Sequence, residues 1–209
     1  STVWSNYYEE AGQRGDYLAV KKQIISDWLS RLNIKTVFDA GANEGEFSEL
    51  AAGFATYVIS TDSDHSAISK LYQKVLQKKS SNIFPFVLDL ANPSPAVGVN
   101  NKERPSFLER IKVDLTLALA LIHHLALGRN IPFEKIAEMF SCAGKYLVIE
   151  FVPGEDEMVR LMTSHKKELL PAYTEENFLT AFQKFFFIHH KQEVSASGRT
   201  LYLMQKHNE

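Results

Sequence analysis

The sequence predicts an open α/β fold of the Rossmann-like type, with a mostly parallel sheet and helices on both faces. Two stretches carry this prediction. Residues 36–38 are a β-branched and apolar run that favours a buried strand, and a turn rich in Gly and Asn separates them from a helical pattern at residues 46–52. Residues 57–62 predict a second strand that ends in an acid. A strand, a tight glycine turn and a helix form the unit that holds a nucleotide-like cofactor in such a sheet.

The turn at residues 39–45 distinguishes two classes of cofactor. A dinucleotide site requires G-x-G-x-x-G, and only Gly41 of the three corresponding positions is a glycine here. The turn is closer to acid-x-G-x-G-x-G, the first motif of class I S-adenosylmethionine (SAM) methyltransferases, which it resembles at Asp39, Gly41 and Gly45. Asn43 is the departure, and Asn tolerates positive φ better than other non-glycine residues. By itself, the turn supports a plain connection from strand to helix nearly as well.

A second acid favours the cofactor interpretation. Asp62 ends the second predicted strand, 21 residues after Gly41. In this type of fold an acid about 20 residues beyond the turn receives the ribose hydroxyls, and a carboxylate accepts two hydrogen bonds at once. Asp64 lies close by and could instead cap the next helix, which opens at residues 66–68. We therefore assign the ribose to Asp62.

The composition is that of an ordinary globular protein. The chain has 209 residues, 45% hydrophobic and 23% charged, which suits one α/β domain with a sizeable core. A formal charge of −2 gives no strong nucleic-acid signal. We expect no membrane span and no signal peptide, because no apolar run is long enough. The single Cys142 excludes an internal disulfide, suits a reducing, cytoplasmic compartment, and is expected to be buried. Because the first residue is Ser1, we expect a processed or partial chain.

Residues 1–35 are predicted to be a helical lead-in to the sheet. Within them, residues 17–29 form an amphipathic pattern whose apolar side would cover one face of the sheet. This covering role is the favoured one for each residue taken singly. In the alternative, one of four side chains closes over the cofactor pocket: Tyr7, Tyr8, Tyr17 and Lys21.

The third predicted strand brings another acid to the same edge of the sheet. A helix is expected at residues 63–79 and a strand at residues 83–89, and Pro85 inside that strand argues for an edge position. Asp89 could accept a hydrogen bond from the adenine amino group while Leu90 packs on the ring. Residues 91–110 then form a polar loop long enough to be functional or disordered.

The fourth predicted strand is followed by two histidines. Residues 113–122 are almost continuously apolar, as a strand covered on both faces should be, and His123 and His124 come next. Ligands bind at the carboxyl ends of strands in such sheets, so either imidazole is a candidate general base or acceptor anchor. We expect one of them to face the pocket, and a purely structural pair is the alternative. No Cys or acid has the spacing of a zinc ligand with this pair.

The fifth predicted strand ends in a carboxylate. Residues 145–151 form this strand, and Glu150 is expected to orient one of the two histidines across the acceptor site. An inserted helical segment at residues 153–173, with one helix expected at residues 155–170, would form the far wall of that site. The remaining expected elements are a helix at 131–141, a helix from 174 to 184, and a hairpin at 185–194 and 199–206 that carries His189 and His190 away from the cofactor.

The whole chain resembles the class I SAM-dependent methyltransferases. The resemblance implies a seven-stranded sheet in the order 3-2-1-4-5-7-6, formed by residues 1–209 as a single SAM-binding domain. Longer runs resemble a bacterial family that includes the nodulation protein NoeA, with departures at Asn43 and Val99. These runs lie at residues 89–95, 103–104, 117–125, 149–152 and 199–203.

The resemblance implies methyl transfer from SAM to an O, N or S atom of an acceptor that we expect to be a small molecule, with S-adenosylhomocysteine (SAH) as the product. No metal is required by this chemistry. A non-catalytic SAM-binding or scaffold domain is the first alternative, and a nucleotide-dependent oxidoreductase is the second. The residues predicted to contact the cofactor are Asp39, Gly41, Asn43, Gly45, Asp62, Asp89, Leu90 and Ala120, and those predicted to act on the acceptor are His123, His124 and Glu150.

Overall fold

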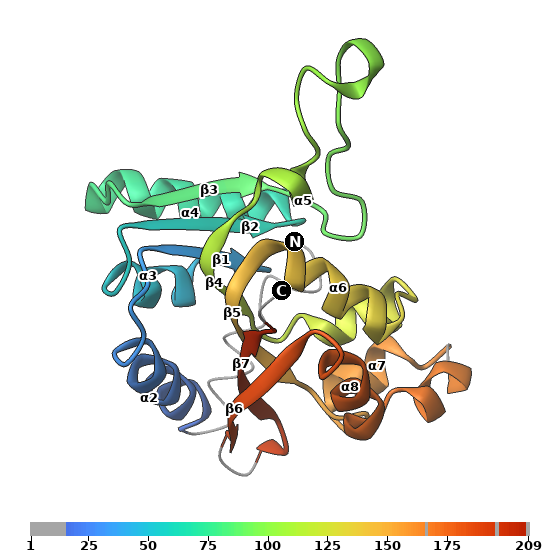
Figure 1. Cartoon of the computed structure of the whole chain (residues 1–209). Helices are drawn as coiled ribbons and strands as arrows, with labels where there is room; N and C mark the ends of the chain where they lie inside the picture. The colour runs from blue at the N-terminus through green and yellow to red at the C-terminus, as the bar shows by residue number, and fades with distance from the viewer. Residues whose placement is uncertain (1–15, 166, 195–196, 208–209) are drawn as a thin grey trace.

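The computed structural model describes residues 16–165, 167–194 and 197–207, so Tyr7 and Tyr8 lie outside the described residues. One seven-stranded sheet runs through the molecule in the order β3-β2-β1-β4-β5-β7-β6, which confirms the expected order (Figure 1). The strands are β1 Thr36–Ala40, β2 Tyr57–Asp62, β3 Ile83–Val87, β4 Val113–Ala118, β5 Gly144–Phe151, β6 Phe186–Glu193 and β7 Thr200–Lys206.

The sheet is parallel from β3 to β5 and ends in an antiparallel hairpin. β1 pairs in parallel with β2 and β4, and the outer pairs β2–β3 and β4–β5 are also parallel. β7 lies antiparallel to both β5 and β6. β3 is the edge strand, as Pro85 predicted, because proline has no amide proton to donate to a further strand.

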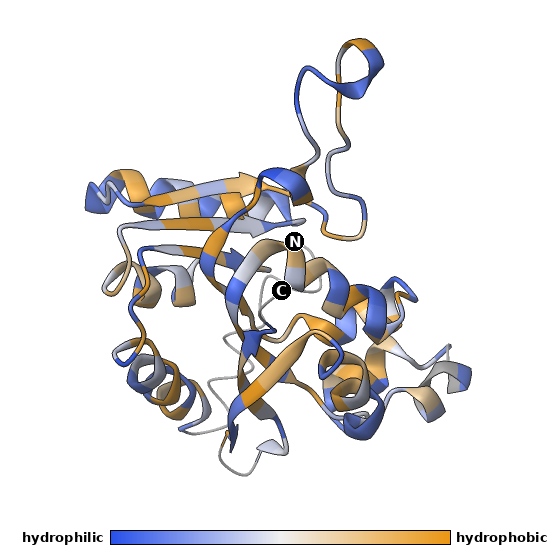
Figure 2. Ribbon diagram, in the orientation of Figure 1, coloured by the Kyte–Doolittle hydropathy of each residue, from blue (hydrophilic) through white to orange (hydrophobic). Residues whose placement is uncertain are grey.

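Helices cover both faces of the sheet and enclose two apolar cores. α2 and α3 pack on one face, around Ile25 and Phe47, while α6 and α8 pack on the other, around Phe140 and Phe178. Figure 2 shows hydrophobic and hydrophilic segments alternating along these helices, as expected for helices with one buried side. The α-helices are α2 Tyr17–Leu29, α3 Glu46–Ala52, α4 His65–Lys78, α5 Phe107–Arg110, α6 Phe133–Ala143, α7 Glu157–Met162 and α8 Glu175–Phe182.

The strand predicted at residues 113–122 ends four residues early. β4 stops at Ala118, and Ala120 has a φ of 49°, which breaks the strand. A short π-helix, His124–Gly128, follows. Leu119, Ile122 and Leu125 are buried although they lie outside the strand. The apolar run therefore indicates burial, and both the strand and the turn after it are buried. Apolarity alone does not reveal where a strand ends.

Three other expectations are corrected. The predicted 83–89 strand ends at Val87, so Asp89 lies in the loop beyond it. The 153–173 segment contains α7 and a separate 3₁₀ helix, Lys167–Ala172, instead of one helix. Cys142 is exposed, although we expected a buried residue.

The long loop after β3 projects away from the body of the protein, as Figure 1 shows. An antiparallel bridge between Val97 and Arg104 narrows it into an arm, and Val99 near its tip is 72% exposed. None of the helices in the described part of the chain is long and apolar enough to span a membrane.

Candidate cofactor and acceptor site

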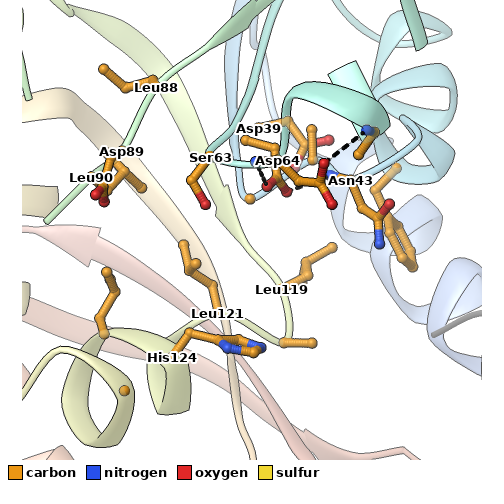
Figure 3. Close-up of a pocket in the computed structure, with 18 of the residues that line it drawn as sticks. Asp39, Asn43, Ser63, Asp64, Leu88, Asp89, Leu90, Leu119, Leu121 and His124 are labelled. Carbon is orange, nitrogen blue, oxygen red and sulfur yellow. Dashed lines mark hydrogen bonds between the residues drawn. The ribbon is translucent and has the colours of Figure 1, made fainter. Parts of the chain in front are cut away.

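A cavity of about 460 Å³ opens where β1, β2, β3 and β4 end (Figure 3). Each of these strands sends the residues that follow it into the wall, as the rule for open α/β sheets requires. The lining after the four strands comprises Gly41, Ala42 and Asn43; Asp62, Ser63 and Asp64; Leu88, Asp89 and Leu90; and Leu119, Ala120 and Leu121. The structure thus brings together most of the predicted cofactor residues.

The glycine turn has the backbone that its sequence predicted. Gly41, Asn43 and Gly45 all have positive φ, and Asn43 at 47° shows why Asn replaces Gly at little cost there. Gly41 lies in the cavity wall, but Gly45 does not line the cavity. A Cβ at Gly45 would approach Leu71 Cδ1 to 2.2 Å. The contact of Gly45 with the cofactor stays a prediction, while the structure gives this glycine a packing role at the start of α3, against Leu71 of α4.

Asp39 is a buried acid at the floor of the cavity. Its side chain accepts a 2.6 Å hydrogen bond from Ser48 Oγ, and the residue is 2% exposed. Burial raises the pKa of Asp39 to about 6, and the charge of Asp62 adds to the rise, while the Ser48 bond and Lys21 oppose it. The carboxylate is ionised at neutral pH and becomes neutral under mildly acidic conditions.

Asp62 connects two of the turns that form the cavity. Its carboxylate accepts one hydrogen bond from the amide of Asn43 and one from the amide of Asp64, each of 2.9 Å. Burial raises the pKa of Asp62 despite these two bonds. Asp64 accepts from the amides of Ser66 and Ala67 and so caps α4, as the alternative for Asp64 proposed, and it also lines the cavity.

Asp89 and Leu90 lie together at another part of the wall. Asp89 Oδ2 accepts from Arg129 Nη2 at 3.0 Å, and Oδ1 accepts from the amide of Ala91 at 2.9 Å. Leu90 is 7% exposed and presents an apolar surface beside the carboxylate. Sequence reasoning missed Arg129, because its approach to Asp89 spans 40 positions of the chain.

Lys21 extends from α2 and lines the cavity. This position supports the alternative that Lys21 closes over the cofactor pocket. The residue is only 3% exposed and its Nζ lies 4.8 Å from the centre of the Phe47 ring. It donates a 2.6 Å hydrogen bond to Glu150. Burial lowers the pKa of Lys21, and the charge of Glu150 opposes that shift. The sequence signal for this buried position was the spacing, because a lysine four residues after Tyr17 lies on the same side of the helix.

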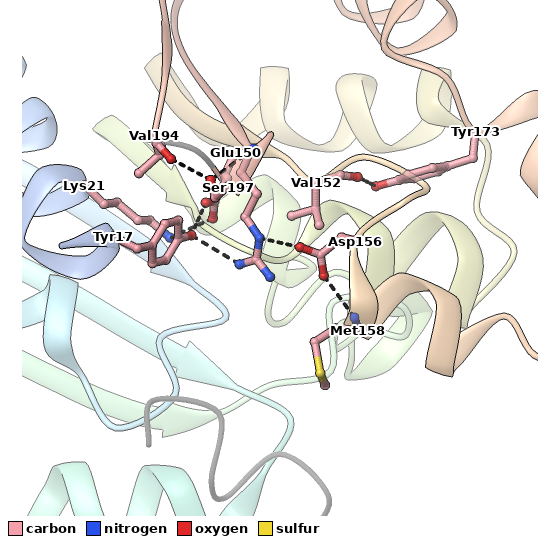
Figure 4. A network of polar contacts seen from close by, with 10 residues as sticks. Tyr17, Lys21, Glu150, Val152, Asp156, Met158, Tyr173, Val194 and Ser197 are labelled. Atoms are coloured by element: carbon pink, nitrogen blue, oxygen red, sulfur yellow. Dashed lines mark hydrogen bonds and ion pairs between the residues drawn. The ribbon is translucent and has the colours of Figure 1, made fainter. Parts of the chain in front are cut away.

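The role predicted for Glu150 is corrected by its contacts. The residue is fully buried, and its carboxylate accepts hydrogen bonds from the Tyr17 hydroxyl and from Lys21 (Figure 4). Burial would raise the pKa of Glu150, but the charges of Lys21 and Arg199 outweigh it and hold the pKa below its usual value. Its two oxygens thus orient a lysine and a tyrosine, where a histidine was expected.

The two histidines differ in their access to the cavity. Their rings lie 4.2 Å apart, but only His124 lines the cavity, as expected for one of the pair. Burial lowers the pKa of His124 to about 4, assisted by the charge of Arg199. Burial also lowers the pKa of His123 well below its usual value. Both rings are neutral at pH 7, and neither nitrogen of His123 has a hydrogen-bond partner among the described residues.

The backbone beside His124 is unusual. Ala120 lines the cavity with positive φ although it is not a glycine, a conformation that costs about 1–2 kcal/mol. The π-helix that begins at His124 is a rare form that occurs often at functional sites. Strain concentrated on one wall of one cavity supports a functional role for that wall.

Four carboxylates line the cavity, against two cations. The carboxylates are Asp39, Asp62, Asp64 and Asp89, and the cations are Lys21 and Arg129. This balance favours a ligand that carries positive charge near the floor of the cavity. No group of three His, Cys, Asp or Glu side chains suited to a metal ion occurs within the described ranges.

Comparison with known proteins gives one sequence relative and many structural ones. No protein-family model matches the chain. It is 33% identical over 210 residues to nodulation protein NoeA of Rhizobium meliloti (strain 1021), covering 98% of this chain but 43% of NoeA. The chain therefore spans less than half the length of that relative.

Solved structures share the fold at lower identity. The N-methyltransferase NodS from Bradyrhizobium japonicum WM9 matches with a TM-score of 0.62 at 14% identity, over 92% of this chain and 99% of NodS. Magnesium protoporphyrin IX methyltransferase (ChlM) from Synechocystis PCC 6803, with bound SAH, matches with 0.60 at 18% identity, over 92% and 86% of the two chains. The chain therefore has the class I methyltransferase fold and is a sequence relative of part of NoeA.

Proposed function

We propose that this chain binds SAM in the cavity at the ends of β1–β4 and transfers its methyl group to an O, N or S atom of a small-molecule acceptor. The observation that carries the proposal is that Gly41, Asp62 and Asp89 all line the same cavity. These residues stand at the positions where a glycine turn, a ribose acceptor and an adenine acceptor are needed. The sequence relationship to NoeA and the shared fold support it.

The charges of the cavity fit this cofactor. SAM supplies an activated methyl group on a positively charged sulfur, together with an ammonium and a carboxylate. Asp39 and Asp62 provide negative charge where the amino-acid end would lie, next to the glycine turn. Lys21 is a buried cation at the same end, so we assign it to the carboxylate. Asp62 lines the cavity while it accepts from the amides of Asn43 and Asp64, so we assign the ribose hydroxyls to its carboxylate.

His124 is the residue of the pair that we propose for the acceptor. It faces the cavity, and its neutral ring can accept a hydrogen bond from an incoming nucleophile. A base with a pKa near 4 is weak, so its main contribution would be orientation of the acceptor, and orientation can supply about 7–11 kcal/mol of barrier reduction. Met162 of α7 and the apolar Leu121 and Leu125 line the cavity with it.

The proposed function is tested by calorimetric titration of the protein with SAM, SAH and NAD. SAM and SAH should bind and NAD should not. Binding of NAD alone, or of none of the three, would show the proposal to be wrong. Turnover is then measured as SAH release in the presence of panels of amines, carboxylic acids, alcohols and thiols, with SAM alone as the blank.

The two alternatives are less well supported. A scaffold role would be favoured if residues 91–110 filled the pocket, but no described residue of that stretch lines the cavity, and the arm projects away (Figure 1). An oxidoreductase would be favoured by a glycine at position 46, the last position of G-x-G-x-x-G, but that residue is Glu46.

The proposal extends to the organisation of the chain. We propose that residues 1–209 act as a single SAM-binding domain, supported by one continuous sheet with an apolar core on each face. We also propose a cytoplasmic location, which a single cysteine supports because reducing compartments disfavour disulfides.

A further inference from the structure

Five buried polar side chains are linked one to the next by hydrogen bonds (Figure 4). Lys21 and Tyr17 come from α2, Glu150 from β5, Asp156 from the start of α7, and Arg199 from the residue before β7. None of the five is more than 7% exposed. We call these five residues the buried relay.

The hydrogen bonds of the buried relay run in one order. Lys21 Nζ donates to Glu150 Oε2 at 2.6 Å, and the Tyr17 hydroxyl donates to Glu150 Oε1. Arg199 Nη1 donates to the Tyr17 oxygen at 3.2 Å, and Arg199 Nε donates to Asp156 Oδ2 at 2.9 Å. Lys21 Nζ also donates to the Tyr17 oxygen at 3.4 Å, so Tyr17 contacts Lys21, Glu150 and Arg199 and links the half with Lys21 to the half with Asp156.

The two ends of the buried relay reach two walls of the same cavity. Lys21 lines the cavity directly. At the other end, Asp156 Oδ1 accepts from the amide of Met158 at 3.0 Å and so caps α7, the helix that places Met162 in the cavity wall. α2 and α7 lie far apart in the sequence, and these side chains connect them.

Stability by itself does not explain this arrangement. Two cations and two carboxylates are buried together, and a buried ion pair is often no more stabilising than well-packed apolar residues of the same size. Apolar contacts would be enough to hold α2 against β5. The buried relay provides defined hydrogen-bond geometry from one wall of the cavity to the other, which apolar contacts do not.

We propose that Tyr17 and Arg199 are positioning residues that couple the cofactor end of the cavity to α7. This inference rests on the proposed function, because it takes Lys21 as the partner of the cofactor carboxylate. When an anion meets Lys21, Glu150 shares that cation with a competitor, and its bond to Tyr17 strengthens. Tyr17 and Arg199 then hold Asp156, and α7, more firmly against the acceptor side of the cavity.

Hydrogen exchange of α7 tests the coupling directly. The exchange of the amides of Met158, Arg160 and Thr163, each of which donates a hydrogen bond within or at the cap of α7, is measured with and without SAH. Each protein is saturated with SAH, as checked by calorimetry. We expect SAH to slow exchange of these amides about tenfold in the wild-type protein, which lies within the usual range of coupling between sites.

Two tyrosine variants separate the coupling from general loosening. Tyr17→Phe removes the link while its ring stays in place, so SAH should no longer slow exchange in α7. Tyr173→Phe is the matched control, because this buried tyrosine donates to the Val152 carbonyl at 2.9 Å outside the buried relay. It should respond to SAH as the wild type does.

The possible outcomes have separate meanings. If the wild-type protein does not bind SAH, both the proposed function and this inference are wrong. If it binds SAH and α7 exchange is unchanged, or if Tyr17→Phe keeps the full effect, only the coupling is wrong. Equal loss of the effect in both tyrosine variants also contradicts the coupling, because the effect would then not depend on the Tyr17 link.

Discussion

The carboxylate of Asp62 accepts a 2.9 Å hydrogen bond from the backbone amide of Asn43. The bond joins the end of β2 to the glycine turn after β1, and the same carboxylate also holds the amide of Asp64. One acid therefore sets the shape of the cavity floor and also lines the cavity.

We predict that Asp62→Ala weakens SAM binding by about tenfold to a hundredfold, because bound hydroxyls lose a charged acceptor. Calorimetry measures the effect. Asp114→Ala is the matched control, since Asp114 also accepts from two backbone amides, those of Lys35 and Thr36, but does not line the cavity. Equal affinities in the Asp62 variant and the wild type would contradict the ribose assignment.

We predict that SAM binding weakens as the pH falls through about 6, where Asp39 takes up a proton. The folded pKa of this acid is raised, so its negative charge is present above pH 6 and is lost below it. Affinity should fall by up to about tenfold per pH unit below that value. Asp62, whose pKa is also raised, adds to the dependence.

Two comparisons test whether Asp39 causes this pH dependence. Asp39→Asn keeps an oxygen for Ser48 and should flatten the profile. SAH lacks the charge on sulfur and should show a shallower slope than SAM in the wild-type protein. A profile for Asp39→Asn as steep as that of the wild type would assign the titration to another group.

We predict that Asp89→Asn weakens SAH binding by about tenfold, because the adenine amino group loses a charged acceptor. In either orientation the new amide places an NH₂ group against a donor, Arg129 on one side or the amide of Ala91 on the other. Arg129→Ala is the control for the ion pair, and it should cost less because both partners are exposed. Unchanged SAH affinity in Asp89→Asn would show that Asp89 only closes its loop.

We predict that His124→Ala still binds SAM but loses about a hundredfold in methyl transfer, because misplacement of a bound acceptor by about 1 Å costs roughly that much. SAH release with an acceptor found in the panels measures it. His189→Ala on the hairpin, outside the cavity, should transfer methyl groups at the wild-type rate. Full activity in the His124 variant would make the whole His pair structural.

We predict that His123→Leu does not lower the melting temperature. The ring nitrogens of His123 are buried without a hydrogen-bond partner among the described residues, so an apolar side chain of similar size removes a desolvation cost. Ile122→Ala, at a fully buried neighbour, should lower the free energy of unfolding by about 2–5 kcal/mol. This control would show that the region is sensitive to a loss of packing. A comparable drop for His123→Leu would reveal a role for its nitrogens.

The features that depend on local patterns could be predicted from the sequence. Apolar runs and their spacing predicted the strands, Pro85 predicted the edge strand, and the turn with Gly41 and Asn43 predicted positive φ where the structure has it. Asp62 lies in the cavity wall because a parallel sheet brings the ends of its strands to one edge. These are consequences of periodicity and of chain direction.

The contacts between side chains that are distant in the sequence could not be predicted, because they depend on how the elements pack. Glu150 pairs with Lys21, which lies 129 positions earlier, and this pairing replaces the predicted pairing with a histidine. The packing of Gly45 against Leu71 and the exposure of His124 alone to the cavity likewise depend on neighbouring elements. A residue's type states which partners it can accept, but the packing of α2 and α7 against the sheet determines which partner lies within hydrogen-bond distance.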